Sequence, residues 1–219
     1  MGRHQILCLA NVGLCALSLS SVEAATFATH GDSRNRAEFL SKATLETITG
    51  KTRAVTAQFE VDPADVSNAT GTVTVDLKTL DTGIDMRNKH MRENQLETDQ
   101  YPTASFALKT VRAPGDTSAS ADSATKLTLT AGQPTKVTVA GTLTIHGVAH
   151  EITAPATVTY APAGSDAKGK IPGNQLHLQT SFPLKLADYS IVRPEFLFMK
   201  VAEELTITID MFVDDRPQK

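Results

Sequence analysis

The sequence contains no tryptophan and few other aromatic residues, with eight phenylalanines and three tyrosines among 219 residues. It also contains only two cysteines, Cys8 and Cys15, and both lie within the first 24 residues. The chain beyond residue 24 therefore has no thiol for a disulfide, a thiolate metal site or a cysteine nucleophile. Its stability must come from an apolar core rather than from disulfides.

Strong charge and known catalytic signatures are also missing. The formal net charge is −3 and remains −3 without residues 1–24, which argues against nucleic-acid binding. The sequence has no Gly-x-Ser-x-Gly elbow, phosphate loop or dinucleotide fingerprint. Acidic pairs such as Glu203-Glu204 and Asp214-Asp215 would point to opposite sides of a strand, as solvated charges do. We therefore expect no catalytic residue and no cofactor.

Two histidines, His146 and His150, are the best candidates for metal ligands. On one continuous strand they would lie about 13 Å apart, which is too far to share an ion. A hairpin turn between them would bring them closer, but the sequence offers no evident third ligand. We therefore expect no metal site.

The N-terminal segment has the layout of a secretory signal peptide. A short, mildly basic head precedes a mostly apolar run over residues 6–20, and Val22 and Ala24 provide small side chains before a cleavage point after Ala24. The apolar run is too short for a comfortable membrane span, although an N-terminal anchor is the alternative. We expect residues 1–24 to be a signal peptide and residues 25–219 to form one exported domain.

Most of the remaining sequence alternates between apolar and polar residues, which predicts an all-β fold. The expected strands cover residues 37–40, 55–61, 71–80, 103–111, 126–129, 136–145, 148–160, 176–184 and 201–213. The apolar residues have odd numbers in the strand at 136–145 and even numbers from Val148 onward. A continuous strand would keep the same parity, so we expect His146-Gly147 to form a turn between two strands. About eight sequential strands with short connections are compatible with a sandwich or an up-and-down barrel, and slightly favour the barrel.

One stretch, residues 81–100, breaks this alternation between the strands expected at 71–80 and 103–111. Its residues from Asp85 onward tolerate a helix, with Asp85 as the cap. Tyr101-Pro102 then requires extended backbone and begins the next strand. We interpret this stretch as a short helical plug between two strands; a solvated surface crossover is the alternative.

Three motifs, in this order, resemble the signatures of the YceI family. The first comprises Asp81-Thr82-Gly83, Arg87-Asn88-Lys89-His90-Met91, Tyr101-Pro102 and Phe106. The second is Gly141-Thr142-Leu143-Thr144-Ile145-His146-Gly147-Val148, and the third is Leu186-Ala187-Asp188-Tyr189-Ser190-Ile191. The resemblance covers residues 26–214. The family pattern has aspartate at the position of Asn88 and glycine at the position of Ser190, so position 88 offers no carboxylate to Arg87.

The resemblance implies an eight-stranded, antiparallel, lipocalin-like β-barrel in the bacterial periplasm. It also implies that the barrel holds a polyisoprenoid, an isoprenoid quinone or a similar long-chain lipid. The many Val, Thr and Ala residues at inward positions favour an open apolar tunnel, and a packed core is the alternative. A linear tail gains about 0.8 kcal/mol per buried carbon unit, so such a tunnel would bind it tightly with little polar contact.

Strand parity and the matched motifs give the candidate ligand site. The apolar tunnel candidates are Phe59, Val73, Val75, Leu77, Phe106, Leu108, Leu143, Ile145, Phe182 and Ile207. The polar candidates at the mouth are Arg87, Asn88, His90, Tyr101 and Asp188. Arg87 and His90 either contact a quinone headgroup or hold the plug against the barrel.

We therefore expect a periplasmic carrier or storage protein for a long-chain isoprenoid lipid or quinone. Transient contact with the membrane or a membrane protein, and a homodimer, are compatible with this function. A second hypothesis is a non-enzymatic stress-response module that binds a membrane redox protein, with any bound lipid incidental. A third, an enzyme that acts on a lipid, is disfavoured by the missing catalytic motifs.

Overall fold

The computed structural model describes residues 24–42, 46–116, 126–165, 172–193, 195–196 and 199–217. Its strands are β1 (Ala25–Ala28), β2 (Arg36–Lys42), β3 (Thr47–Thr52), β4 (Val55–Val61), β5 (Thr70–Asp76), β6 (Thr103–Arg112), β7 (Pro134–Ile145), β8 (Val148–Ala161), β9 (Gln175–Lys185), β10 (Glu195–Phe196), β11 (Met199–Lys200) and β12 (Glu204–Asp214). Its helical segments are η1 (Val66–Asn68), η2 (Leu77–Thr79), α1 (Asp85–His90), η3 (Met91–Gln95) and η5 (Leu186–Tyr189). The expected signal peptide, residues 1–24, lies outside the described residues except for Ala24.

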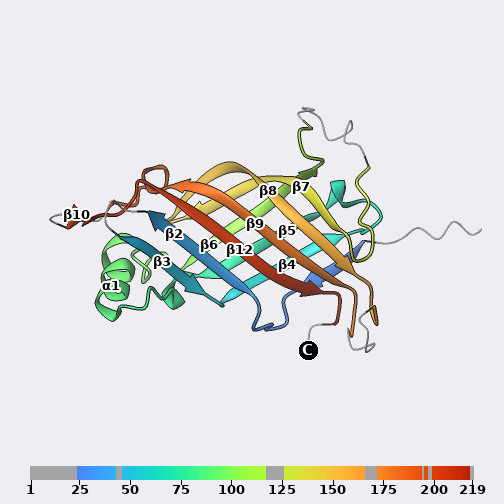
Figure 1. Cartoon of the computed structure of the whole chain (residues 1–219), viewed down its shortest axis with the longest axis horizontal. Coiled ribbons are helices and arrows are strands. Elements are labelled where there is room, and N and C mark those ends of the chain that lie inside the picture. Colours follow the sequence, from blue (N-terminus) through green and yellow to red (C-terminus); the bar gives the residue numbers. More distant parts are fainter. Residues whose placement is uncertain are drawn as a thin grey trace, which may run out of the picture.

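The strands close into a barrel in the order β1-β4-β5-β6-β7-β8-β9-β12, and β12 returns to β1. Each neighbouring pair is antiparallel. The predicted eight-stranded, lipocalin-like barrel with a short helical plug is therefore confirmed. Figure 1 shows the barrel lengthwise, with α1 at one end and the C-terminus at the other. We call these the plugged end and the closed end.

The seam of the barrel is made by different strands at its two ends. β12 pairs with β1 only at Asp214, near the closed end, and with β2 over Thr206–Asp210, toward the plugged end. β2 continues into an antiparallel pairing with β3. The other edge of β3 reaches the start of the plug through Lys51 and Asp81, which exchange two backbone hydrogen bonds of 2.9 Å. The wall at the plugged end therefore ends against the plug.

Local sequence explains most of the strand boundaries. β4 alternates strictly between buried residues at odd positions and exposed residues at even positions. At the β7–β8 hairpin, His146 and Gly147 have φ angles of 53° and 73°. A two-residue hairpin turn that matches the strand twist requires positive φ at both central residues. The predicted turn is thus confirmed, together with the change of parity that it causes.

Three expectations about the strands were wrong. The expected strand at 71–80 ends at Asp76, because the Asp76 carboxylate accepts a hydrogen bond from the Lys78 N–H and begins η2. Residues 126–129 form no strand in the described chain and instead exchange backbone hydrogen bonds with residues 63 and 66 beside η1. β12 begins at Glu204 rather than at residue 201. β1 and β3, which are short and lack clear alternation, were not predicted at all.

The closed end of the barrel is filled with side chains. Phe27, Val137, Leu176 and Val213 are each at most 2% exposed and belong to one apolar cluster. A second cluster lies at the plugged end, with buried members Leu143, Leu184, Leu186, Tyr189, Ile191 and Leu205. No helix in the described parts of the chain is both long and apolar enough to cross a membrane.

Replacing Leu176 with alanine tests the packing of the closed end. Because Leu176 is 2% exposed in the first cluster, we expect Leu176→Ala to lower the free energy of unfolding by about 2–5 kcal/mol. Urea unfolding measures this loss. Gln179→Ala, at an exposed position of the same strand, should change the same quantity by less than about 0.5 kcal/mol. Equal losses for the two variants would contradict a packed closed end.

Candidate functional site

A cavity of about 160 Å³ lies inside the half of the barrel nearer the plugged end. Its lining residues come from β2, β5 to β9 and β12, with Leu77 of η2 and Leu80 just after it. The lining is almost entirely apolar, and Glu38 is the only ionisable residue among the described residues that form it. The neighbours of Glu38 on β2, Ala37 and Phe39, belong to or pack against the apolar clusters. The site therefore offers an apolar surface and little to support acid–base chemistry.

Eight of the ten apolar candidates line this cavity. They are Val73, Val75, Leu77, Phe106, Leu143, Ile145, Phe182 and Ile207. The other two, Phe59 and Leu108, are not among the described residues that line it. Phe59 lies opposite Gly71 and Gly71 lies opposite Leu108, in a row where side chains fill the barrel. Strand parity predicts that both side chains point into the barrel, but it does not predict how far along the barrel axis they lie.

Several lining residues were absent from the sequence-based set. These are chiefly Phe39, Leu80, Ile152, Leu184, Ile209 and Met211. Ile152, Leu184 and Ile209 have the inward parity of strands that the sequence did predict, so a complete parity count would have found them. Leu80 carried no such signal, because the short helix η2 precedes it and the strand alternation has already ended.

The plug is held at the barrel rim by Asn88, which is 6% exposed. Its side-chain oxygen accepts hydrogen bonds from the backbone N–H and the hydroxyl of Thr82, at 2.8 and 2.7 Å. Its side-chain nitrogen donates to the Asp81 carboxylate at 2.8 Å. Asn88 thus connects α1 by hydrogen bonds to Asp81 and Thr82, and Asp81 pairs with β3. Asp85, expected as the helix cap, is instead the first helical residue, and no side chain caps this end.

Arg87 finds its carboxylate partner outside its own motif. Its guanidinium donates to the Glu46 carboxylate at 2.9 Å and to the hydroxyl and backbone oxygen of Thr82, both at 3.0 Å. Glu46 immediately precedes β3. Arg87 therefore braces the plug against the β2–β3 hairpin, which is the second of the two roles considered for it.

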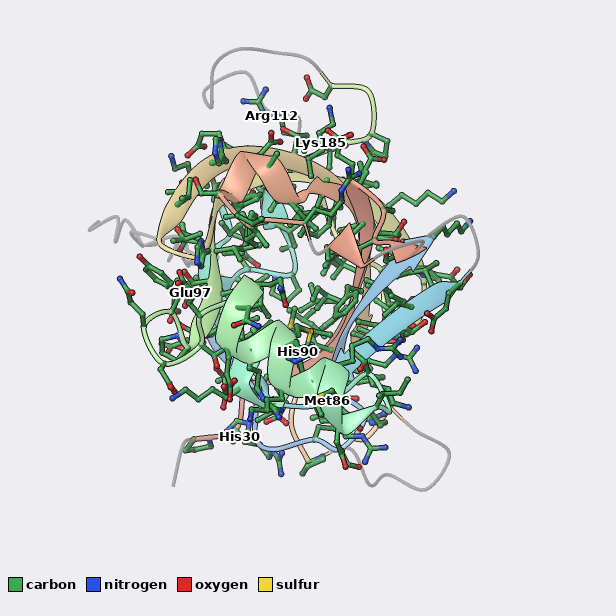
Figure 2. All side chains as sticks on the ribbon, turned by 90° about the vertical axis from the view of Figure 1, so that its left-hand side faces the viewer. His30, Met86, His90, Glu97, Arg112 and Lys185 are labelled. Atoms are coloured by element: carbon green, nitrogen blue, oxygen red, sulfur yellow. The ribbon has the colours of Figure 1, made fainter. Side chains whose placement is uncertain are left out.

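The remaining polar candidates lie around the same opening. Figure 2 looks into the plugged end and shows α1 crossing one side of the ring, with His90 and Met86 on it. Tyr101 packs edge-on against His146, with ring centroids 4.5 Å apart, and His146 Nε2 lies 2.8 Å from a Glu97 carboxylate oxygen. Asp188 is exposed and belongs to η5.

The two histidines considered as metal ligands have different partners. His146 interacts with Glu97, whereas His150 Nε2 lies 2.7 Å from the backbone oxygen of Asp188 and its ring packs edge-on against Tyr189. Within the described residues, no group of three or more potential ligands gathers closely enough to hold a metal ion.

The pKa values of Asp81 and Tyr189 are shifted at this end of the barrel. The Gly83 N–H and then the Asn88 amide lower the pKa of the Asp81 carboxyl below its usual value. Burial, and after it the charge of Asp188, raises the pKa of the Tyr189 hydroxyl. Asp81 thus stays ionised as an acceptor, and Tyr189 stays neutral, as its 3% exposure in the second cluster requires.

A closed antiparallel barrel with an apolar interior cavity under a helical plug defines a lipocalin-like barrel protein. The family model of the YceI-like domain matches residues 26–213, so the chain belongs to the YceI-like family. No curated protein matches the chain.

Solved structures show the same fold at low sequence identity. BcnA of Burkholderia cenocepacia is 22% identical, with 81% of this chain and 95% of that chain covered and a TM-score of 0.62. A polyisoprenoid binding domain of Saccharophagus degradans, implicated in plant cell wall breakdown, is 20% identical, with coverages of 89% and 100% and a TM-score of 0.61. A YceI protein of Campylobacter jejuni is 19% identical, with coverages of 77% and 85% and a TM-score of 0.56.

Replacing Asn88 with aspartate tests the polar network of the plug. The introduced carboxylate would lie next to the Asp81 carboxylate, because Asn88 now donates to it at 2.8 Å. We expect Asn88→Asp to lower the melting temperature at pH 7, where both groups would be ionised. The difference from wild type should shrink as the pH falls toward about 4, because the introduced carboxyl can donate again once it is protonated, while wild type begins to lose the contribution of ionised Asp81. A pH-independent difference in thermal unfolding would contradict this account.

Replacing Ser190 with glycine tests backbone strain at the end of η5. Ser190 has a φ of 56°, in the left-handed region. A glycine would relieve about 1–2 kcal/mol of backbone strain but would cost about 0.5–1 kcal/mol in conformational entropy. We therefore expect Ser190→Gly to raise the free energy of unfolding by about 0.5 kcal/mol. Urea unfolding measures the gain, and Ser190→Ala, which keeps the Cβ, should show none. A gain in both variants would mean that strain is not the cause.

Proposed function

We propose that this protein is a non-enzymatic carrier that binds a lipid with a linear isoprenoid tail, such as a polyisoprenoid or an isoprenoid quinone. The observation that carries this proposal is the apolar cavity between the packed closed end and the helical plug. The name of the polyisoprenoid binding domain from Saccharophagus degradans, which shares the fold, supports the same ligand class. Among the described lining residues Glu38 alone is ionisable, which supports binding rather than catalysis.

The size of the cavity limits what the barrel holds without rearrangement. A cavity of about 150 Å³ holds one benzene-sized molecule, and this cavity measures about 160 Å³. On this scale it holds about one five-carbon isoprene unit. Five buried carbons would contribute roughly 4 kcal/mol, which corresponds to about millimolar affinity before the losses of binding are subtracted. A longer tail has to displace aromatic side chains of the lining, such as Phe39, Phe106 and Phe182.

The surface of the plugged end supports a transient contact with a membrane. Ile84, Met86 and Val192 are 49%, 63% and 76% exposed. Ile84 and Met86 lie at the start of α1, and Val192 follows η5. Apolar side chains beside the opening suit the transfer of a lipid tail from a bilayer into the barrel. The proposed location is the periplasm, which rests on the signal-peptide layout of residues 1–24.

Leu143→Lys tests the cavity as the tail site. Leu143 points into the cavity, so a lysine there would place a charge against an apolar tail. Thr144→Lys is the matched control, because the adjacent residue of β7 has the opposite parity. We expect native mass spectrometry of protein from its own periplasm to show a discrete lipid mass on wild type and Thr144→Lys. Leu143→Lys should lose most of it.

Lipid extraction of the same samples identifies the cargo, and circular dichroism checks that both variants are folded. A folded Leu143→Lys protein that keeps the lipid would remove the cavity from consideration as the tail site. A wild-type chain that carries no lipid, and takes up none when incubated with isoprenoid quinones, would contradict the carrier function. The alternative of a module that binds a membrane redox protein would then be the next to test.

A further inference from the structure

The wall of the barrel is split between β8 and β9 at the plugged end. The ladder between these strands joins Ala156–Ala161 to Gln175–Thr180 and stops there. Beyond it, β8 continues to Val148 paired only with β7, and β9 continues to Lys185 paired only with β12. In the described residues, the facing segments 148–155 and 181–185 therefore share no ladder.

Two prolines explain where the ladder stops. Pro155 of β8 lies one residue and Pro183 of β9 three residues beyond the last pair, and neither has a backbone N–H to donate. The Thr180 hydroxyl donates to the Pro155 backbone oxygen at 2.7 Å, which satisfies that acceptor at the end of the ladder. The two prolines in the sequence therefore account for the split between β8 and β9.

A second cavity, of about 240 Å³, occupies this split. Leu143, Ile152, Phe182 and Leu184 line both this cavity and the apolar cavity inside the barrel. The same four side chains therefore form the boundary between the two spaces. The remaining lining residues are His150, Glu151, Pro183, Lys185, Asp188, Tyr189 and Glu204. The apolar cavity inside the barrel thus adjoins a polar cavity in the split of the wall. An amphiphilic ligand requires this combination of an apolar and a polar space.

The turn η5 covers the polar side of the split. His150 lies 2.7 Å from the Asp188 backbone oxygen, and its ring packs against Tyr189 at 5.2 Å between centroids. Leu186 of the same turn donates a backbone hydrogen bond to Glu203, before β12. In Figure 2, Lys185 lies across the ring from His90 and Met86, so the split and the plug are on opposite sides of the opening.

The charges of this pocket indicate the class of headgroup. Among the described residues that line it, the ionised ones are Glu151, Asp188 and Glu204 against Lys185, and none is an arginine. Lys109 lies 2.8 Å from the Glu151 carboxylate and balances its charge. Two carboxylates then face one ammonium group. A phosphate, with a charge of about −1.5 to −2, would be repelled here, whereas a hydroxyl or a carbonyl could hydrogen-bond.

We propose that the pocket in the β8–β9 split binds the headgroup of the lipid whose tail fills the cavity, and that it takes an uncharged, hydrogen-bonding headgroup rather than a phosphate. This inference rests on the proposed function. It places the headgroup in the wall of the barrel, opposite the plug. It also narrows the ligand class to quinones and alcohols with isoprenoid tails.

The absence of tryptophan from the chain provides a clean test. Lys185→Trp puts an indole in the pocket, and Met86→Trp puts one on α1 across the opening. The probe is a benzoquinone with a two-unit isoprenoid tail, whose ring quenches indole fluorescence on contact. We expect the probe to remove most of the emission of Lys185→Trp and to leave Met86→Trp near its ligand-free intensity. Thermal unfolding and native mass spectrometry check that both variants are folded and bind the probe.

The outcomes separate this inference from the carrier function. Quenching of Met86→Trp alone, or of neither variant while the probe is bound, would overturn the headgroup site and leave the carrier function intact. Failure of wild type and both folded variants to bind the probe would contradict the carrier function itself. In a parallel titration of wild type, an isoprenoid alcohol should bind at least about ten-fold more tightly than its phosphate. Equal affinities would overturn the preference for an uncharged headgroup.

Discussion

The edge of β12 is the constraint on which the rest of the structure depends. It is too long for one partner, so β1 covers it at the closed end and β2 covers it toward the plugged end. β1 also pairs with β4 and completes the ring, and the interior there is filled. β2 is followed by β3, whose outer edge meets only the Lys51–Asp81 bridge among the described residues. In the part of the chain that the structure describes, no complete ring of strands surrounds the apolar interior at this end, and a separate plug has to shield it.

The plug is attached to the same hairpin whose edge it covers. Asp81 pairs with the backbone of β3, and Arg87 reaches Glu46 just before that strand. Asn88 connects both contacts, because it accepts from Thr82, to which Arg87 also donates, and donates to Asp81. Buried polar groups stabilise a structure only when their hydrogen bonds are complete. The amide of Asn88 fits this place better than a carboxylate, because its nitrogen donates to an acceptor that is already ionised.

The sequence predicted the class of fold and the inward side of several strands, but not how far along the barrel axis each inward side chain lies. Alternation identifies the inward face of a strand, so Val73, Phe106 and Leu143 were placed correctly; they lie side by side on β5, β6 and β7. The same rule selected Phe59 and Leu108, which lie two residues further toward the packed end. The residues of different strands that lie at the same height along the barrel axis are decided by the strand register. This register depends on partner strands that are far apart in the sequence.

Contacts across the seam were also hidden from sequence reasoning. β3 reads Thr-Ile-Thr-Gly-Lys-Thr and gives no clear alternation, so nothing marked Glu46 as the partner of Arg87, 41 positions later. The matched motif did locate Arg87 and Asn88 at the rim. It gave their position without their partners, because a motif records which residues recur and not what they touch.

The split between β8 and β9 is where the proposed long ligand would leave the small cavity. The interior space of about 160 Å³ is too small for a complete polyisoprenoid. If every pair of neighbouring strands were hydrogen-bonded along its full length, the rest of the proposed ligand would have to leave the barrel past the plug. Pro155 and Pro183 prevent the β8–β9 ladder from closing, and side chains rather than backbone hydrogen bonds seal the gap. Side-chain contacts rearrange far more easily than a ladder of backbone hydrogen bonds. The wall is therefore easier to open here than along a complete ladder, and the proposed ligand, with an apolar tail and a polar head, would span it where the apolar and polar spaces meet.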